Sequence, residues 1–337
     1  MNKKIRIGIL GCANFAKRYA IPAFQAIDNA EVVSIASRDY EKAKEWATMF
    51  NIKAEESYDS LIESDEIDAV HIPLPNSLHK EWIIKAARNG KHIICEKSID
   101  TNLKDVKEIV EECKKNGVVI YENFMCGFHP QHQKVLSMIE DNEIGKPFVF
   151  RSFFGFPKMN EDNFRYKKEL GGGVLNENGA YVVFMARKMF GKEPISVTCN
   201  IYVDGIDWSG TATLDFDDGI SALLAFNLNA VYQNNYSLWG DKGIINVNRA
   251  YSIPPDMKPE VSLTVNKDMK EITTAIDVEP ANHFELIFKD FCDTIINKDS
   301  NTSKVEACYE KIINQAKVLE ALRVSAKENR KVNLKEF

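Results

Sequence analysis

Long apolar runs, an excess of basic charge and low-complexity segments are all missing from this sequence of 337 residues. No stretch of about 18 consecutive apolar residues occurs, so a membrane-spanning helix is not expected. Only 17 glycines and 11 prolines are present, which excludes a collagen-like chain. The 43 basic residues face 49 acidic ones, giving a net charge of −6, so neither nucleic acid nor an anionic membrane is an expected partner.

Cysteines at the spacing of a metal site or a disulfide framework are missing too. The seven cysteines are odd in number and scattered, and none forms a C-x-x-C pair. This is typical of reduced thiols in a cytoplasmic protein. The apolar run at the N-terminus is interrupted by Arg6 and soon reaches Gly11, which is not the pattern of an export signal. We therefore expect a cytoplasmic location.

What is present is a regular alternation over the first third of the chain. Short β-branched runs predict strands at 5–10, 32–37, 69–74, 92–95 and 118–121. Amphipathic stretches between them predict helices at 14–27, 40–50, 77–89 and 103–116. Strands that alternate with helices are typical of βαβ units. This pattern predicts an α/β fold with a doubly wound parallel sheet.

The pattern changes after about residue 122. Alternating apolar and polar residues predict strands at 147–154, 195–203, 210–216, 221–227, 235–239 and 261–265, with helices at 129–141, 173–190, 283–296 and 304–326. A length of about 150 residues per domain suggests two domains. We predict a dinucleotide-binding domain over 1–122 and, over 123–337, an α+β domain for substrate binding and oligomerisation, with a large, mostly antiparallel open sheet.

A glycine turn joins the first predicted strand to the first helix. Gly11 allows the tight turn, and the amides that follow can hold a pyrophosphate at the helix N-terminus. Ala13 stands where a second glycine is usual. The strand-turn-helix context still favours a dinucleotide site over a simple turn. The predicted cofactor-binding residues here are Gly11, Cys12, Ala13, Asn14 and Phe15.

The end of the second strand bears on the choice between NAD and NADP. An acid there binds the ribose 2′-hydroxyl, whereas an arginine accommodates the 2′-phosphate. Ser37 and Arg38 suit the phosphate, and Asp39, one residue later, favours NAD. We predict NADP(H), with NAD as the alternative.

Two further strands end in polar residues at the carboxyl edge of the sheet, where ligands of open α/β sheets bind. The residues predicted to contact the cofactor there are Leu74, Pro75, Asn76, His79, Glu96 and Lys97. Three groups of residues resemble motifs of the glucose-fructose oxidoreductase and inositol dehydrogenase family (Gfo/Idh/MocA): Gly11-x-Ala13, Pro75-Asn76 with His79, and Glu96-Lys97. The resemblance implies a Rossmann domain with Lys97 beside the nicotinamide, although Ser98 replaces the proline of the family's E-K-P motif.

The second domain carries a further resemblance. Residues 171–181 are similar to the family's G-G-G-x-L-x-D-x-G-x-[HY] segment, with Glu177 where aspartate is usual and Tyr181 where histidine or tyrosine is found. The i, i+4 spacing puts these two residues on one helical face. Segments 11–22, 122–132, 165–166 and 234–255 resemble NADP-dependent ketoreductases of this family, which reduce a 3-keto group on a dTDP-linked deoxysugar.

The resemblance implies hydride transfer from NADPH to a ketone, whose oxygen must then receive a proton. We predict Tyr181 as the acid, Lys97 as its electrostatic partner or the direct donor, and Glu177 as orienting Lys97 or a sugar hydroxyl. The residues predicted to hold the rest of the substrate are Arg165, Tyr166, Tyr232, Asn235, Tyr236 and Arg249.

Other interpretations remain open. Two alternatives are a dehydrogenase of a free sugar, polyol or dihydrodiol, and a non-catalytic regulator that binds NADP. His129 and His132 lack the further ligands of a metal site, so no metal is predicted. By resemblance, a homodimer or homotetramer that associates through the C-terminal sheet is expected.

Overall fold

A computed structural model describes residues 3–337, and these residues form two compact units. The first unit contains residues 3–123 and 284–316, and the second contains 124–283 and 317–337. The predicted division at residue 122 did not anticipate that 284–316 returns to the first unit. It returns because apolar side chains of this segment complete the first core: Phe288 stacks on Phe24 at 3.9 Å, and Ile312 packs beside Ile109.

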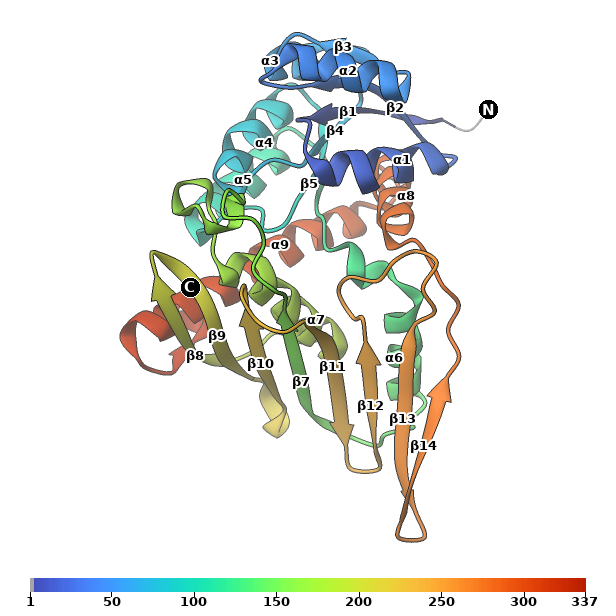
Figure 1. Cartoon of the computed structure of the whole chain (residues 1–337), viewed down its shortest axis with the longest axis vertical. Helices are drawn as coiled ribbons and strands as arrows, with labels where there is room; N and C mark the ends of the chain where they lie inside the picture. Colours follow the sequence, from blue (N-terminus) through green and yellow to red (C-terminus); the bar gives the residue numbers. More distant parts are fainter. Residues whose placement is uncertain (1–2) are drawn as a thin grey trace. The chain divides into compact units, whose positions relative to one another are not determined.

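The first unit is built on a six-stranded parallel sheet in the order β3-β2-β1-β4-β5-β6 (Figure 1). The strands are β1 Ile5–Leu10, β2 Ala30–Ala36, β3 Lys53–Glu55, β4 Ala69–Ile72, β5 His92–Cys95 and β6 Ile120–Glu122. The reversal of strand order beside β1 confirms the doubly wound α/β fold. The short β3 was not predicted from the sequence, because three residues give too little periodicity to recognise.

Three helices of this unit begin at a residue whose side chain caps them. Asp39, Ser57 and Asn102 each accept a hydrogen bond from a main-chain N–H in the first turn of α2, α3 and α5. The segment predicted as one helix over 14–27 is a π-helical turn, η1, followed by α1. The helical elements are η1 Ala16–Ala20, α1 Ile21–Ala26, α2 Tyr40–Phe50, α3 Tyr58–Glu63, η2 Asn76–Leu78, α4 His79–Arg88, α5 Leu103–Lys115, α8 His283–Ile296 and α9 Thr302–Glu328, whose last residues belong to the second unit.

The second unit contains a nine-stranded sheet in the order β14-β13-β12-β11-β7-β10-β9-β8-β15. All its strand pairs are antiparallel except β7 with β10, which confirms the prediction of a mostly antiparallel sheet. The strands are β7 Pro147–Gly155, β8 Ser196–Asp204, β9 Ile206–Asp215, β10 Ser221–Asn227, β11 Gln233–Gly240, β12 Gly243–Asn248, β13 Glu260–Lys267, β14 Lys270–Ile276 and β15 Val332–Asn333. The sequence analysis did not anticipate β12, β14 and β15.

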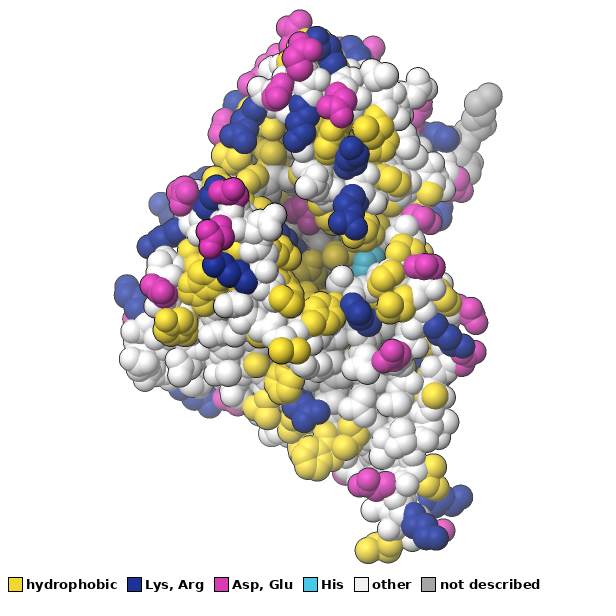
Figure 2. All heavy atoms as spheres, in the orientation of Figure 1, with side chains coloured by type: hydrophobic (Ala, Val, Ile, Leu, Met, Phe, Trp, Pro, Cys, Tyr) yellow, Lys and Arg dark blue, Asp and Glu magenta, His cyan; other side chains and the backbone are white. Residues whose placement is uncertain are grey.

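Helices cover one face of this sheet and leave the other open. Ala222, Leu224 and Phe226 of β10 are buried on the covered face, whereas Leu223 between them is 44% exposed. Figure 1 shows α7 behind the strands, and Figure 2 shows hydrophobic side chains on the open face over β7 and β11. The helical elements are η3 Met125–Phe128, α6 Pro130–Glu140, η4 Phe164–Tyr166, η5 Lys168–Leu170, η6 Leu175–Gly179, α7 Ala180–Phe190, η7 Asp217–Gly219 and η8 Leu334–Glu336.

Two properties of the described residues bear on function. All seven cysteines are free thiols. Within residues 3–337, no helix combines the length and the apolar character that crossing a membrane requires.

Candidate functional site

The glycine turn after β1 has the geometry that a dinucleotide loop needs. Gly11 has φ +115°, and a Cβ there would lie 2.9 Å from the Leu74 side chain, so only glycine fits. Its N–H donates to the Ala36 carbonyl at 2.8 Å, which fixes the turn against the end of β2. Cys12 and Ala13 are half-buried and Asn14 is exposed, while Phe15 leads directly into η1. A π-helical turn at this place is typical of a functional segment.

Of the residues after β2, Asp39 has a partner within the protein and Arg38 is exposed to solvent. The Asp39 carboxylate caps α2 by accepting the Lys42 N–H at 3.2 Å. The Ser37 hydroxyl accepts the Asp39 N–H at 3.2 Å and lies beside the Cys12 thiol, whose pKa is raised by burial. Arg38 is exposed. Asp39, the acid that favours NAD, is therefore bound to the N-terminus of α2, whereas Arg38, which suits NADP, faces solvent.

Glu96, which follows β5, is held by one residue of β4 and by one that follows β6. Asn123 donates to Glu96 Oε1 at 2.6 Å, and His71 Nε2 lies 3.4 Å from the same oxygen. His71 and Asn123 are fully buried and were not singled out in the sequence. They fix the carboxylate that immediately precedes Lys97, which is itself 7% exposed and joined to Ser98 by a cis peptide bond.

His79, which was predicted to contact the cofactor, is held between two loops. Its ring is fully buried, with Nε2 2.8 Å from the Leu74 carbonyl oxygen and Nδ1 3.0 Å from that of Ser98. His79 therefore joins the loop after β4 to the loop after β5. Leu74 and Pro75 are half-buried in the first of these loops, and Asn76 is buried at the start of η2.

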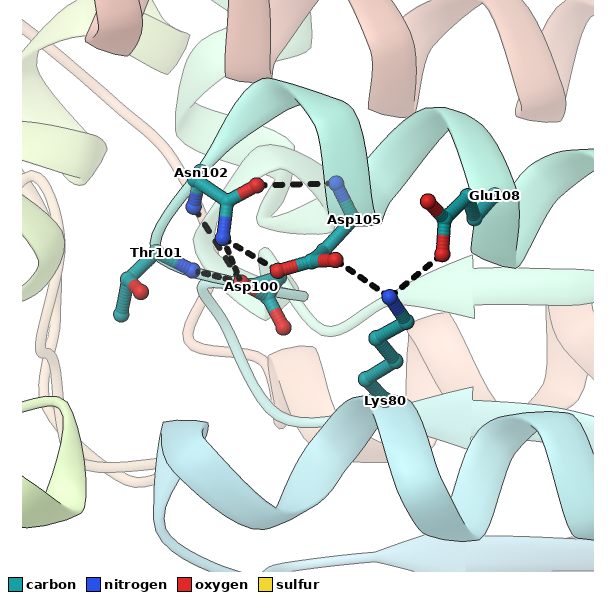
Figure 3. Close-up of polar contacts among 6 residues, drawn as sticks. All are labelled: Lys80, Asp100, Thr101, Asn102, Asp105 and Glu108. Atoms are coloured by element: carbon teal, nitrogen blue, oxygen red, sulfur yellow. Dashed lines mark hydrogen bonds and ion pairs between the residues drawn. The ribbon is translucent and has the colours of Figure 1, made fainter.

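A second set of polar contacts anchors the chain that follows Lys97 (Figure 3). Asp100 accepts the main-chain N–H groups of Thr101 at 2.6 Å and Asn102 at 3.2 Å. Lys80, next to His79 on α4, forms ion pairs with Asp105 and Glu108 of α5. The first turn of α4 thus holds the segment after β5 at two places: His79 binds it in the interior, and Lys80 pairs with it at the surface.

In the second unit, the glycine triplet allows a close approach of the chain to itself. A Cβ on Gly173, which has φ +127°, would collide with the Asp207 carboxylate, and one on Gly172 would collide with the Arg165 carbonyl. Asp207 accepts the Leu175 N–H at 2.8 Å and so starts the helical segment. Burial raises the pKa of Asp207. The helix predicted from Gly173 begins at Leu175, with η6 as its π-helical first turn.

The run Asn176-Glu177-Asn178 lies in this π-helical turn and is buried throughout. Arg323 donates to Asn176 Oδ1, and Asn178 donates to the Asn227 carbonyl at 2.9 Å. Between them, Glu177 Oε2 accepts from Arg165 Nε at 3.0 Å. The structure therefore joins two predicted site residues, the Glu177 carboxylate and the Arg165 guanidinium.

Tyr181 follows in the first turn of α7 and is 8% exposed. Its hydroxyl donates to Met125 Sδ at 3.6 Å, which is a weak interaction. The rings of Phe124, Phe154 and Tyr251 surround it at 5.4 to 5.9 Å. The ring is held by packing against these three aromatic side chains.

Tyr232 and Arg249 are also brought together. Arg249 Nη1 donates to the Tyr232 hydroxyl at 3.0 Å, and its guanidinium lies 4.7 Å from the centre of that ring. Asn234 joins this pair, because its side chain donates to the Tyr232 hydroxyl at 2.8 Å. Asn234 was not singled out in the sequence. Asn235, the predicted residue, lies on the other side of β11 and donates to Gln233 at 2.9 Å. The alternation of side chains along a strand distinguishes the two.

Tyr236, which was predicted to hold the substrate, lies in the interior of the second unit. It is 1% exposed, its hydroxyl lies 2.9 Å from His132 Nδ1, and burial raises its pKa. It is a core residue on the covered face of the sheet. Tyr166, by contrast, is half-buried, with its ring stacked at 5.1 Å on Trp208 and its hydroxyl accepting the Met159 N–H at 2.7 Å.

The two histidines of α6 and its N-terminus have protein partners. His132 Nε2 lies 2.9 Å from the Ala250 carbonyl oxygen, and His129 Nδ1 accepts the Gln131 N–H at 3.2 Å. Burial lowers the pKa of His132 to about 3 and that of His129 to about 4. Across residues 3–337, no three potential metal ligands among His, Cys, Asp and Glu lie together.

Comparison with known families agrees with this arrangement. The profile described as "Oxidoreductase family, NAD-binding Rossmann fold" matches residues 5–124, and the profile of the GFO/IDH/MocA C-terminal domain matches residues 132–246. The chain belongs to the Gfo/Idh/MocA family. The resemblance drawn from the sequence is confirmed, and so is the prediction of an NAD(P)-dependent oxidoreductase with a Rossmann domain.

Members of the Gfo/Idh/MocA family that resemble this chain include sugar oxidoreductases. A dTDP-3,4-didehydro-2,6-dideoxy-alpha-D-glucose 3-reductase of Saccharopolyspora spinosa is 36% identical over 267 residues, covering 78% of this chain and 80% of that protein. The structure of KijD10, a 3-ketoreductase from Actinomadura kijaniata in complex with NADP and TDP-benzene, matches with a TM-score of 0.89 at 30% identity, covering 96% of this chain and 98% of that one. A D-xylose 1-dehydrogenase (NADP(+)) of Haloferax volcanii is 29% identical, covering 97% and 99%.

Proposed function

We propose that this protein reduces the C3 keto group of a nucleotide-linked deoxysugar with NADPH. The observation that carries the proposal is the similarity, over nearly the whole chain, to a 3-ketoreductase bound to NADP and a TDP derivative. The lysine after β5, the tyrosine on α7 and the paired arginine and tyrosine beside β11 supply the groups that such a reaction needs.

The cofactor supplies hydride to the ketone carbon, and the protein must stabilise and protonate the oxygen. Lys97 and Tyr181 are the proposed catalytic residues, because an ammonium group and a phenol hydroxyl can each donate a proton or a hydrogen bond to the developing alkoxide. In this proposal Tyr181 donates the proton, and the Lys97 ammonium stabilises the developing negative charge. The aromatic rings around Tyr181 hold its side chain in place.

Two groups in the second unit suit the nucleotide part of the substrate. Arg165 and Arg249 can each form paired hydrogen bonds with phosphate oxygens. The Tyr232 ring, fixed by Asn234 and Arg249, can stack on a base. These local cations matter because the net charge of the chain is −6 and would repel a diphosphate.

The test follows NADPH with three substrates: its oxidation by a dTDP-linked 3-keto-deoxysugar, its oxidation by the same sugar without the nucleotide, and its formation from NADP during oxidation of D-xylose. We expect the nucleotide-linked ketone to have the highest kcat/KM. Faster oxidation of free D-xylose would favour a free-sugar dehydrogenase, and tight NADP binding without turnover of any of them would favour a regulator.

The cofactor preference gives a second expected result. NADPH should bind more tightly than NADH, and Arg38→Ala should narrow the difference by about 10- to 100-fold, the size of one charge-assisted hydrogen bond to the 2′-phosphate. Fluorescence titration with both nucleotides measures this. Arg88→Ala is the matched control, because Arg88 is paired with Glu112 at the end of α4. Equal affinities of the unmodified protein for the two nucleotides would contradict the assignment.

We also propose that two copies associate through the open face of the nine-stranded sheet and that the protein acts in the cytoplasm. Tyr202, Leu223 and Trp239 are between 44% and 62% exposed on this sheet, and a groove of about 500 Å³ lies among Phe153, Thr211 and neighbouring residues. Exposed apolar surface of this kind marks an interaction site. A monomeric mass in light scattering would contradict the association.

A further inference from the structure

Glu177 and Arg165 form an ion pair in which one partner is buried. The Glu177 side chain is 6% exposed and that of Arg165 is 26% exposed, with 3.0 Å between Oε2 and Nε. A buried carboxylate is stable in its charged form only beside a cation or several donors. The buried Glu177 carboxylate therefore orients the more exposed Arg165 guanidinium.

Two more contacts complete the placement of that guanidinium. Arg165 Nη1 lies 3.4 Å from Asn163 Oδ1, and the group sits 4.6 Å from the centre of the Phe164 ring. Among residues 3–337, Nη2 of Arg165 has no hydrogen-bond partner. The side chain is thus oriented by three neighbours and still has N–H groups to offer a ligand.

The main chain of Arg165 is held by the segment that carries Glu177. The Gly173 N–H donates to the Arg165 carbonyl at 3.0 Å, and Gly172 leaves no room for a Cβ beside that carbonyl. Glu177 itself is fixed on both sides, because Asn176 accepts from Arg323 and Asn178 donates to main-chain carbonyls. The glycine triplet and the π-helical turn therefore fix both ends of the ion pair.

We propose that Glu177 is a positioning residue that acts through Arg165, and that the unit it builds binds the diphosphate of the substrate. This inference rests on the proposed function, since it requires a nucleotide-linked sugar. Arginine can satisfy two anions at once, using Nε toward Glu177 and its terminal N–H groups toward phosphate oxygens. Glu177 then contributes to substrate affinity and not to proton transfer, which separates its role from that of Tyr181 four residues later.

The experiment measures binding of dTDP to the NADP-loaded protein by calorimetry, together with steady-state kinetics on the dTDP-linked ketone. Arg165→Leu should weaken dTDP binding by about 10- to 100-fold, the range for a charge-assisted bond, and leave thymidine binding unchanged. Glu177→Leu should raise KM about tenfold with kcat within about threefold. Glu177→Gln keeps an oxygen that accepts from Arg165 Nε, so its KM should lie close to that of the unmodified protein.

A double variant tests the coupling directly. If Glu177 acts through Arg165, Arg165→Leu with Glu177→Leu should bind dTDP no more weakly than Arg165→Leu alone. Glu161→Leu is the matched control, because Glu161 lies in the same loop and pairs with Lys158. Thermal unfolding of each variant checks that it is folded, and Glu177→Gln keeps the test available where Glu177→Leu does not fold.

Three results would overturn the inference. Additive losses in the double variant would show that the two residues act independently. A fall of about 100-fold in single-turnover rate for both Glu177 variants, with dTDP affinity unchanged, would place Glu177 at the reacting atoms. Failure of the unmodified protein to bind dTDP would contradict the proposed function and with it this inference, whereas normal dTDP binding without coupling contradicts the inference alone.

Discussion

Replacing Lys97 with alanine is expected to lower the rate of NADPH oxidation by at least ~100-fold, the lower range for a positioned proton donor or charge. The reason is its place at the end of β5, where ligands of an open parallel sheet bind. Affinity for NADPH should change little, because the pyrophosphate and the 2′-phosphate are assigned to the Gly11 turn and to Arg38. Single-turnover kinetics and fluorescence titration measure the two quantities separately.

Two further variants make this result interpretable. Lys97→Met keeps the apolar part of a side chain that is 7% exposed, so it removes the charge with little loss of packing. It should be as slow as Lys97→Ala if the ammonium matters and substantially faster if only packing matters. Lys85→Met, at a surface lysine paired with Asp59, serves as the control and should retain full activity. Turnover of Lys97→Met within about tenfold of the unmodified protein would exclude the catalytic role.

Tyr181→Phe should lower the rate of the chemical step by ~100-fold or more and remove or shift the alkaline limb of the pH profile. That limb arises because a tyrosine that has lost its proton at high pH can no longer donate it. If Tyr181 only orients the substrate, the loss should stay near tenfold with the limb retained, since one neutral hydrogen bond contributes about 1 kcal/mol. Single-turnover NADPH oxidation across pH separates the two roles.

Tyr181→Phe should remove the hydroxyl without disturbing the packing of the ring. Three aromatic rings hold the side chain and stay in place when the hydroxyl is removed, so thermal stability should change little. Tyr309→Phe provides the opposite control. Its hydroxyl donates to the Val118 carbonyl at 2.6 Å in the first core, so its loss should lower stability by about 1 kcal/mol or more without changing the rate.

Some of the elements that sequence patterns did not reveal are short or unusually exposed. β3 has three residues, too few for a period to appear. β14 is exposed over nearly its whole length, so burial imposes no alternation on its side chains. The segment 284–316 packs into the first core although about 160 residues separate it from residue 123. No local pattern contains that information, because apolar helical faces carry no record of which core they complete.

Site residues were predicted from residue type and spacing. Glu96, Lys97, Glu177 and Tyr181 were predicted because their types and spacing resemble family motifs. The burial of Tyr236 and the contact of Asn234 with Tyr232 were not foreseen, because a strand pattern places neighbours on opposite faces without saying which face the helices cover. The enclosure of the His79 ring by carbonyl groups of two loops was not foreseen either.

The sequence by itself determined three properties of this protein. These are a doubly wound parallel sheet with its dinucleotide turn, a second sheet that is mostly antiparallel, and membership of an oxidoreductase family. It did so because strand and helix periods, glycine turns and strand-end residues are local properties of the chain. Only the tertiary structure decided that Glu177 pairs with Arg165, that Asn234 supports Tyr232, and that His79 joins two loops. Those roles depend on which groups meet at hydrogen-bonding distance, and the packing of segments far apart in the chain sets that distance.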